Sequence, residues 1–178
     1  MDAKAAAMTQ TLPFRISVLV FLQDKNNRFL LLQRKKSPNL GKWTPIGGKL
    51  EMAIGESPFE CAIRETKEEA GMDIQTEDLH LFGMISEKSY EGSGHWLMFL
   101  FHCKKHLEQL PPAIPEGDFA FFKREDIEAI EIPDADREAL WKVFDDHKDS
   151  FVAMRANCSP QKKPEVIVEQ CLTQKKDG

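Results

Sequence analysis

The sequence lacks the features of membrane-embedded, secreted or nucleic-acid-binding proteins. Its longest apolar runs, residues 16–22 and 96–101, are too short to cross a bilayer, and residues 1–11 show no apolar signal-peptide core. The four cysteines are far apart and form no CxxC pair, which argues against a disulfide framework or a zinc site. The net charge is −5 and no long basic run occurs, which disfavours nucleic-acid binding. We therefore expect a cytoplasmic protein with neither a membrane nor a nucleic-acid partner.

The composition is that of one compact globular domain. Hydrophobic residues make up 42% of the 178 residues and charged residues 30%, so the chain can bury a core and remain dissolved. No internal repeat or change in composition marks a second domain. We expect the domain to span residues 13–155, after a flexible N-terminus at 1–12. A polar tail at 156–178 is expected to be weakly ordered or to fold back as a short packed segment.

Strand-like and helix-like segments alternate along the chain. Five segments are rich in apolar or alternating residues and predict strands: 14–22, 28–33, 79–86, 94–103 and 118–123. The polar residues 24–27 between the first two predict a hairpin turn. Residues 43–50 are short, extended and contain glycine, and residues 136–146 have the spacing of an amphipathic helix.

The best helix signal lies between Ser57 and Gly71. Ser57 can cap the helix, Pro58 suits its first position, and Glu60 completes a capping box. Gly71 can end the helix in the left-handed conformation. The residues expected to pack on the sheet share one face: Phe59, Ala62, Ile63, Thr66 and Ala70.

Three glutamates occupy another face of this helix. Glu65, Glu68 and Glu69 have i, i+3, i+4 spacing, so their carboxylates lie close together and repel one another. A solvated acidic face is the simplest interpretation of three such residues by themselves. Clustered carboxylates also suit hard cations such as Mg²⁺ or Mn²⁺, which would relieve the repulsion.

The surrounding residues favour the metal-binding interpretation. The segment reads GGKLEMAIGESPFECAIRETKEEAGM, and its Glu56, followed by Arg64-Glu65-x-x-Glu68-Glu69-x-Gly71, resembles the Nudix box of the Nudix hydrolases. The sequence differs from the family pattern in two places: the loop at residues 49–55 is two residues longer, and Thr66 stands where an aliphatic residue is usual. The resemblance implies an α/β fold, a Nudix-type α/β/α sandwich with a central mixed sheet and helices on both faces.

The resemblance also implies roles for individual residues. The metal ligands would be Glu65, Glu68, Glu69 and the backbone carbonyl of Gly47, and Glu68 and Glu69 would carry most of the catalysis. Glu56 and Arg64 would hold the loop and helix in place. Many family members place a further catalytic glutamate in a loop before the last core strand. Glu116 is the candidate here and Glu91 its rival, although a solvated loop glutamate is an equal alternative for Glu116.

The implied activity is metal-dependent hydrolysis of a nucleoside diphosphate linkage in a small nucleotide. A nucleoside triphosphate, oxidised or not, would give a monophosphate and pyrophosphate. A dinucleoside polyphosphate, to which Tyr90 points weakly, or a nucleotide sugar is the alternative substrate. A Nudix-fold module that binds nucleotides without hydrolysis is an alternative of another class. Arg34 could meet phosphates, and Trp43 and Phe121 could stack on the base, although core packing explains both aromatics equally well.

Overall fold

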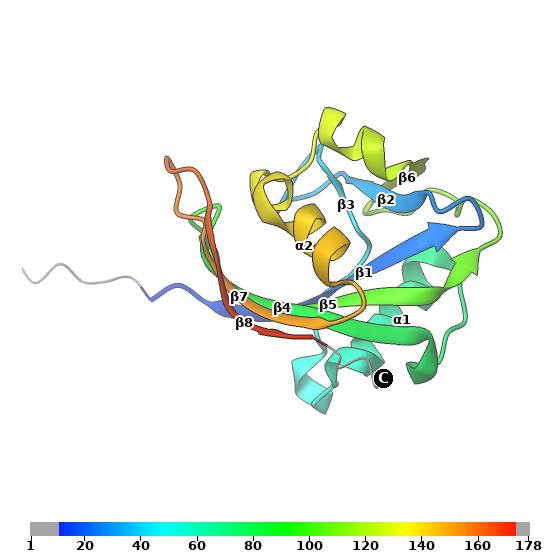
Figure 1. Ribbon diagram of the computed structural model, residues 1–178, viewed down its shortest axis with the longest axis horizontal. Coiled ribbons are helices and arrows are strands. Elements are labelled where there is room, and N and C mark those ends of the chain that lie inside the picture. Colours follow the sequence, from blue (N-terminus) through cyan, green and yellow to red (C-terminus); the bar gives the residue numbers. More distant parts are fainter. Residues whose placement is uncertain (1–10, 174–178) are drawn as a thin grey trace, which may run out of the picture.

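A mixed β-sheet forms the centre of the protein (Figure 1). The computed structural model describes residues 11–173, and within them eight strands run in the order β3-β2-β1-β5-β4-β7-β8, with β6 paired to β2. The pairs β1–β5 and β4–β7 are parallel and the others antiparallel. The strands are β1 (Phe14–Asp24), β2 (Phe29–Arg34), β3 (Trp43–Thr44), β4 (Leu79–Tyr90), β5 (Gly94–Leu107), β6 (Gly117–Phe122), β7 (Phe151–Asn157) and β8 (Glu165–Leu172).

Helices cover both faces of the sheet, as the sequence predicted for an α/β/α sandwich (Figure 1). Helix α1 (Pro58–Ala70) packs on one face and α2 (Trp141–His147) on the other. Short helical turns complete the chain: η1 (Met52–Ile54), η2 (Thr76–Asp78), η3 (Arg124–Ala129) and η4 (Asp136–Leu140). The mixed sheet and the two-sided covering confirm the predicted fold class.

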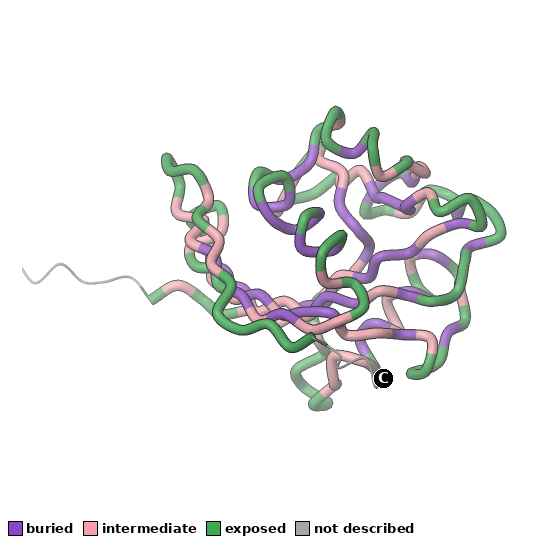
Figure 2. The backbone as a smooth tube through the Cα atoms, in the orientation of Figure 1, coloured by how far each residue is buried: buried purple, intermediate pink, exposed green. Residues whose placement is uncertain are grey.

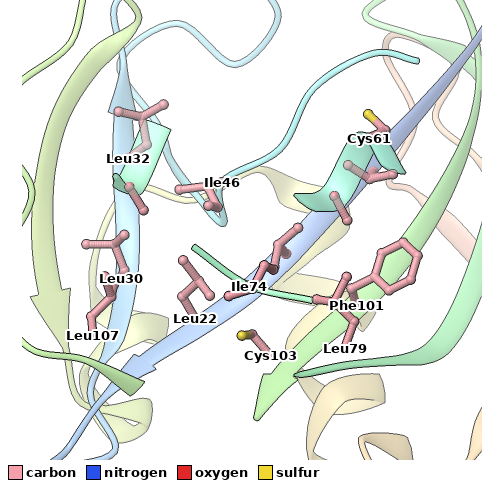
Figure 3. Close-up of a cluster of buried hydrophobic side chains, with 14 of the residues drawn as sticks. Leu22, Leu30, Leu32, Ile46, Cys61, Ile74, Leu79, Phe101, Cys103 and Leu107 are labelled. Atoms are coloured by element: carbon pink, nitrogen blue, oxygen red, sulfur yellow. The ribbon is translucent and has the colours of Figure 1, made fainter. Parts of the chain in front are cut away.

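Alternation along β1 divides the core into two clusters. Val18, Val20 and Leu22 point toward α1, whereas Phe21 points toward α2, because successive strand residues face opposite sides of a sheet. Figure 2 shows the buried residues concentrated along these strands and α2, and Figure 3 shows the cluster on the α1 side. Each fully buried Leu or Phe contributes about 1.5–3 kcal/mol, so both clusters hold the sheet and helices in fixed positions.

Helix α1 begins and ends where the sequence predicted. The side chain of Ser57 accepts a hydrogen bond of 3.2 Å from the amide of Glu60, and the Glu60 carboxylate accepts one of 2.8 Å from the amide of Ser57. Gly71 ends the helix with φ of 67°, in the left-handed conformation. Ala62, Thr66 and Ala70 are buried, as expected from the helical periodicity.

The segments with weaker sequence signals differ from expectation. The predicted strands are present, but β4 and β5 are longer than the apolar runs that indicated them. The expected domain boundary at residue 155 falls inside β7. Of the two outcomes expected for the polar segment beyond it, the structure shows the folded one, because β8 pairs with β7 along its length. The predicted flexible N-terminus falls mainly on residues 1–10, outside the described residues. Among residues 11–173, none of the helices combines the length and apolar character needed to cross a bilayer.

Candidate active site

The glutamate face of α1 opens onto a cleft of about 600 Å³. The cleft is lined by the segment that follows β3, by the loop between β2 and β3, and by residues of β1, β4 and β5. Glu65, Glu68 and Glu69 all line it, together with Gly47 and Gly48. The predicted ligand residues are therefore brought to one concave surface, where a substrate can meet them.

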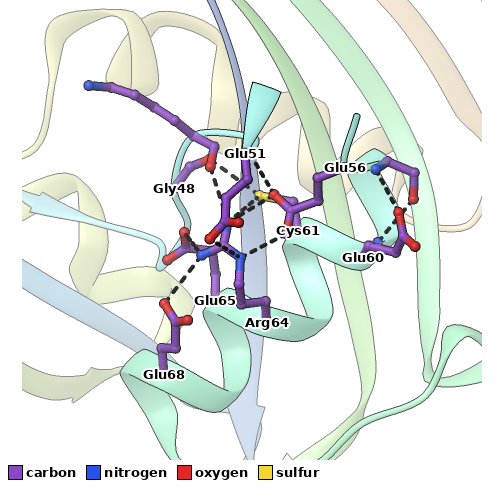
Figure 4. A network of polar contacts seen from close by, with 10 residues as sticks. Gly48, Glu51, Glu56, Glu60, Cys61, Arg64, Glu65 and Glu68 are labelled. Carbon is purple, nitrogen blue, oxygen red and sulfur yellow. Dashed lines mark hydrogen bonds and ion pairs between the residues drawn. The ribbon is translucent and has the colours of Figure 1, made fainter. Parts of the chain in front are cut away.

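Arg64 connects the loop before α1 with the glutamates on the helix (Figure 4). Its Nε donates to Oε1 of Glu56 at 2.7 Å, and its Nη2 donates to Oε2 at 3.0 Å, which makes a two-pronged pair. Nη1 donates to Glu65 at 2.7 Å and to Glu68 at 3.2 Å. Nη2 also donates to the carbonyl of Lys49 at 3.1 Å. One guanidinium thus joins the long loop to the acidic face of the helix.

Glu56 is the buried partner of this pair, and its side chain is 5% exposed. Hydrogen bonds from Arg64 lower the pKa of Glu56 to about 2, and the amide of Glu51 adds a further bond at 2.8 Å. The same pair raises the pKa of Arg64. Both groups therefore stay charged at neutral pH, as the predicted supporting role for Glu56 and Arg64 requires.

Glu69 lies deeper in the cleft than its two neighbours. Its Oε2 accepts a hydrogen bond of 3.0 Å from the amide of Gly47. The pKa of Glu69 is nevertheless raised to about 7, mainly by burial and also by the charges of Glu65 and Glu116, while the charge of Arg34 opposes the rise. Burial also raises the pKa of Glu65. Negative charge is therefore in excess at this end of the cleft, and a cation would relieve it.

Two glycines let the loop after β3 approach the helix. A Cβ at Gly48 would overlap the carboxylate of Glu65, and a Cβ at Gly47 would overlap the carbonyl oxygen of Val18. The amide of Val18 donates a hydrogen bond of 2.9 Å to the carbonyl of Gly48, which holds this loop against β1. Glycine is needed at position 47, where backbone occupies the space, whereas at position 48 a side chain would force the Glu65 carboxylate to move.

The chemistry of these groups fits a hard divalent cation. Carboxylates and backbone carbonyls are the oxygen ligands that Mg²⁺ prefers. Within residues 11–173, no three His, Cys, Asp or Glu side chains converge as a closed set of metal ligands. Arg64 instead holds Glu65, and the Gly47 amide holds Glu69. These carboxylates can reach a cation by exchanging those hydrogen bonds for metal contacts.

Two predicted residues outside α1 also reach the cleft. Glu116 and Arg34 both line it, and both act electrostatically on Glu69. The amide of Lys35 donates to the Glu116 carbonyl at 2.8 Å, which fixes the loop before β6 beside the end of β2. The Nε of Arg34 donates to the carbonyl of Pro38 at 2.7 Å. The loop before β6 thus places the carboxylate of Glu116, and the end of β2 the guanidinium cation of Arg34, near the glutamates of α1.

Three other candidates lie elsewhere. Trp43 packs edge-on against Phe122, with ring centroids 4.9 Å apart, and Phe121 packs against the α1-side core and under the guanidinium of Arg28. Neither aromatic is among the residues that line the cleft, and both pack against the core, which favours the core-packing alternative. Glu91 accepts a hydrogen bond from the amide of Asn39 at 3.0 Å and does not line the cleft either.

Sequence reasoning missed several residues of the cleft. Glu87, Trp96, Met98 and Asp136 line it without having been singled out. Glu87 follows Ile85 on the alternating, buried face of β4, where an apolar residue would be usual. An acid at an inward-facing strand position was the signal that could have found it. Tyr90, noted only for its place in the sequence, also lines the cleft and donates to Oδ1 of Asn39 at 2.5 Å.

Comparison with known proteins agrees with the geometry of the box. The family model of the NUDIX domain matches residues 13–146. The chain belongs to the Nudix hydrolase family. The match covers both faces of the sheet and all the predicted site residues, which confirms the resemblance seen in the glutamate helix.

Several known proteins are similar to this Nudix chain. The uncharacterized Nudix hydrolase YvcI of Bacillus subtilis is 30% identical over 116 residues, which are 65% of this chain and 70% of that protein. The dihydroneopterin triphosphate diphosphatase of Haemophilus influenzae is 35% identical over 95 residues, 51% of this chain and 58% of that enzyme. The match thus spans less than two thirds of that relative. The MutT protein of Bacillus halodurans shares the fold, with a TM-score of 0.69 and 24% identity over 87% of this chain and 97% of that chain.

Proposed function

We propose that this Nudix protein hydrolyses a nucleoside triphosphate, or a closely similar triphosphate, to the monophosphate and pyrophosphate with the help of Mg²⁺ or Mn²⁺. The observation that carries the proposal is the convergence of the three box glutamates, Glu116 and Arg34 on one cleft. The name of the Haemophilus influenzae relative, a diphosphatase of a triphosphate, supports the same reaction.

In this proposal the acidic residues bind the cation and the basic residues bind the phosphates or position the acids. Glu65, Glu68, Glu69 and the Gly47 carbonyl would hold the cation, and Arg64 would orient the first two of them. When bound, the cation supplies neutralisation of phosphate oxygens and lowers the pKa of a coordinated water. Arg34 would bind the phosphate chain at the mouth of the cleft.

Proton removal from the attacking water needs a carboxylate near the phosphates. Glu69 and Glu116 are the two candidates, because both line the cleft and the charge of Glu116 acts on Glu69. In the reaction, water adds to one phosphorus, its proton passes to the carboxylate, and the bridging P–O bond breaks to release pyrophosphate. A base of this kind contributes about 10²–10⁴ in rate.

A panel of substrates tests the proposal. The protein would be incubated with nucleoside triphosphates, dinucleoside polyphosphates and nucleotide sugars, with Mg²⁺, with Mn²⁺ and with a chelator, and the released phosphate species would be identified. The proposal expects pyrophosphate from at least one triphosphate and none in the chelator. Preferred turnover of a dinucleoside polyphosphate or nucleotide sugar would select those substrates. Tight nucleotide binding without turnover would instead select the binding-module alternative.

We also place the protein in the cytoplasm. The four cysteines are all unpaired thiols in the described part of the chain, and Cys61 and Cys103 are buried. Burial raises the pKa of Cys61 to about 12, which keeps it an unreactive thiol. Reduced cysteines of this kind are typical of a reducing compartment, which supports the proposed location.

A further inference from the structure

The loop between β2 and β3 forms one wall of the cleft. It supplies three residues to the lining: Ser37, Pro38 and Asn39. The two ends of the loop are fixed to each other, because the amide of Arg34 donates to the carbonyl of Lys42 at 3.0 Å. The middle of the loop, residues 36–40, lies further from the sheet ladder and depends on contacts of its own to keep one position.

Asn39 supplies those contacts. The hydroxyl of Tyr90 donates to Oδ1 of Asn39 at 2.5 Å, and the amide of Asn39 donates to Oε1 of Glu91 at 3.0 Å. Both partners lie where β4 ends and turns into β5. Among residues 11–173, no other member of the segment 36–40 forms a hydrogen bond or ion pair with a residue outside positions 34–42. Asn39 therefore joins the loop to the β4–β5 turn by itself.

The backbone at this position explains the type of residue. Asn39 has φ of 64°, in the left-handed region that glycine and asparagine adopt more readily than other residues. Glycine would permit the same turn but would offer no acceptor to Tyr90. Burial raises the pKa of Tyr90 well above its usual value, so its hydroxyl keeps the proton and remains a donor. Asparagine thus satisfies both the turn and the contact.

The contacts continue from Asn39 to Arg34. The carbonyl of Pro38, the residue before Asn39, accepts a hydrogen bond of 2.7 Å from Nε of Arg34. The other two guanidinium nitrogens of Arg34 have no hydrogen-bond or ion-pair partner in the described part of the chain, residues 11–173. The charge of Arg34 acts on Glu69, so the guanidinium lies near the acidic face of α1. The loop therefore holds one nitrogen of Arg34 and leaves two for a ligand.

We propose that Asn39 is a positioning residue, which orients the guanidinium of Arg34 toward the phosphates of the substrate by joining the β2–β3 loop to the β4–β5 turn. This inference rests on the proposed function, in which Arg34 binds the phosphate chain. A guanidinium in a fixed orientation can donate two parallel hydrogen bonds to a phosphate. It also loses less conformational freedom on binding than a mobile side chain does.

Binding of pyrophosphate tests the proposal without requiring turnover. Its dissociation constant in the presence of Mg²⁺ would be measured calorimetrically for the wild-type protein, Asn39→Gly, Arg34→Gln and the double variant. Asn39→Gly keeps the left-handed backbone and removes the acceptor, so it should fold and bind about three- to tenfold more weakly. The double variant should bind no more weakly than Arg34→Gln, because the first change acts through the second residue.

Two further variants sharpen the comparison. Tyr90→Phe removes the same hydrogen bond from its other end, so it should weaken pyrophosphate binding by a similar factor and add little to Asn39→Gly. Asn27→Gly is the matched control, since Asn27 also has a left-handed backbone, with φ of 58°, but lies in the turn between β1 and β2, outside the cleft lining. It should bind as the wild-type protein does. With the best triphosphate, Asn39→Gly should raise KM more than it lowers kcat.

The outcomes separate this inference from the proposed function. Unchanged pyrophosphate affinity in Asn39→Gly, or losses that add fully to those of Arg34→Gln, would overturn the positioning role. Weaker binding of Mg²⁺ alone in Asn39→Gly would overturn it as well, because the loop would then support the cation site and not the guanidinium. Failure of the proposed function has another signature, namely no hydrolysis of any triphosphate with Mg²⁺, whatever the loop variants bind.

Discussion

The amide of Gly47 donates a hydrogen bond of 3.0 Å to Oε2 of Glu69, and so joins the loop after β3 to the acidic face of α1. This bond is the only hydrogen bond to the Glu69 carboxylate from the described residues, and burial outweighs it in setting the pKa of Glu69 at about 7. A partly buried carboxyl that accepts only one hydrogen bond, as that of Glu69 does, can release its proton when a cation binds in its place.

The first prediction concerns Mg²⁺ and pH. Because the pKa of Glu69 is raised from 4.5 to about 7, the folded state holds this proton more tightly than the unfolded chain. The resulting stability is fully present below about pH 4.5 and is lost as pH rises through 7. Mg²⁺ must displace the proton, so its affinity should increase over the same range. Thermal unfolding should show stabilisation of about 2.7 kcal/mol at a hundredfold excess over Kd near pH 8, and much less near pH 5.5.

Glu69→Gln supplies the comparison for that measurement. The variant has no carboxyl proton to lose at this position, so its stability should change less between about pH 5 and pH 8. Its stabilisation by Mg²⁺ should be weaker than in the wild-type protein. A wild-type response to Mg²⁺ that is independent of pH and unchanged in Glu69→Gln would contradict the assignment of Glu69 as a cation ligand.

A second prediction concerns the departure from the family pattern at Thr66. The residue is fully buried and its Oγ1 has no hydrogen-bond partner. Thr66→Val keeps the shape of the side chain and removes an unsatisfied hydroxyl, so the free energy of unfolding should rise by about 1 kcal/mol. Urea titration measures the change. Thr76→Val, at an exposed position of η2, should alter stability by less than about 0.5 kcal/mol. Destabilisation of Thr66→Val would reveal a partner for the hydroxyl.

The elements that the sequence predicted well are those with local signals. Ser57, Glu60 and Gly71 define the ends of α1 through hydrogen bonds within a few residues of each other, so the helix could be placed from the sequence alone. The strand β8 has no comparable signal, because its side chains are mostly exposed and its partner β7 is the source of its order. The pairing of two strands cannot be read from the side-chain pattern of an exposed strand by itself.

The same distinction applies to the site. Glu65, Glu68 and Glu69 lie on one helix, and helical spacing places them on one face. Glu87 and Asp136 come together through the packing of η4 on the sheet, which brings residues 49 positions apart to one cleft. Trp43 and Phe121 show why a type of residue does not by itself identify a site, since an aromatic side chain that can stack on a base packs equally well in a core.

A third prediction concerns the narrow space at Gly48. Gly48→Ala should displace the Glu65 carboxylate, because the added Cβ would overlap it. A shift of about 1 Å at a ligand can cost about a hundredfold in rate, so kcat for the best triphosphate should fall at least tenfold. The double variant Gly48→Ala with Glu65→Gln should lose little more than Glu65→Gln, since both changes act on one group. Fully additive losses would show that the alanine acts elsewhere.

A fourth prediction separates the two loop glutamates. Glu116 lines the cleft near Glu69, whereas Glu91 accepts a hydrogen bond from the Asn39 amide and lies outside the lining. Glu116→Gln should lower kcat by at least about tenfold, as for a general base or an electrostatic group. Glu91→Gln should leave kcat within about twofold and affect KM more, through the loop that contains Asn39. The reverse order would assign the base to Glu91.

The central claim is that the glutamate face of α1 carries the catalysis, and kcat of Glu68→Gln and Glu69→Gln with saturating Mg²⁺ tests it most directly. Each substitution keeps size and removes one charge, so each should lower kcat by about a hundredfold or more, with a smaller effect on KM. Glu60→Gln is the control, because Glu60 belongs to the helix cap and not to the cleft. If both variants kept a kcat near that of the wild-type protein and of Glu60→Gln, the assignment of the metal site to α1 would be wrong.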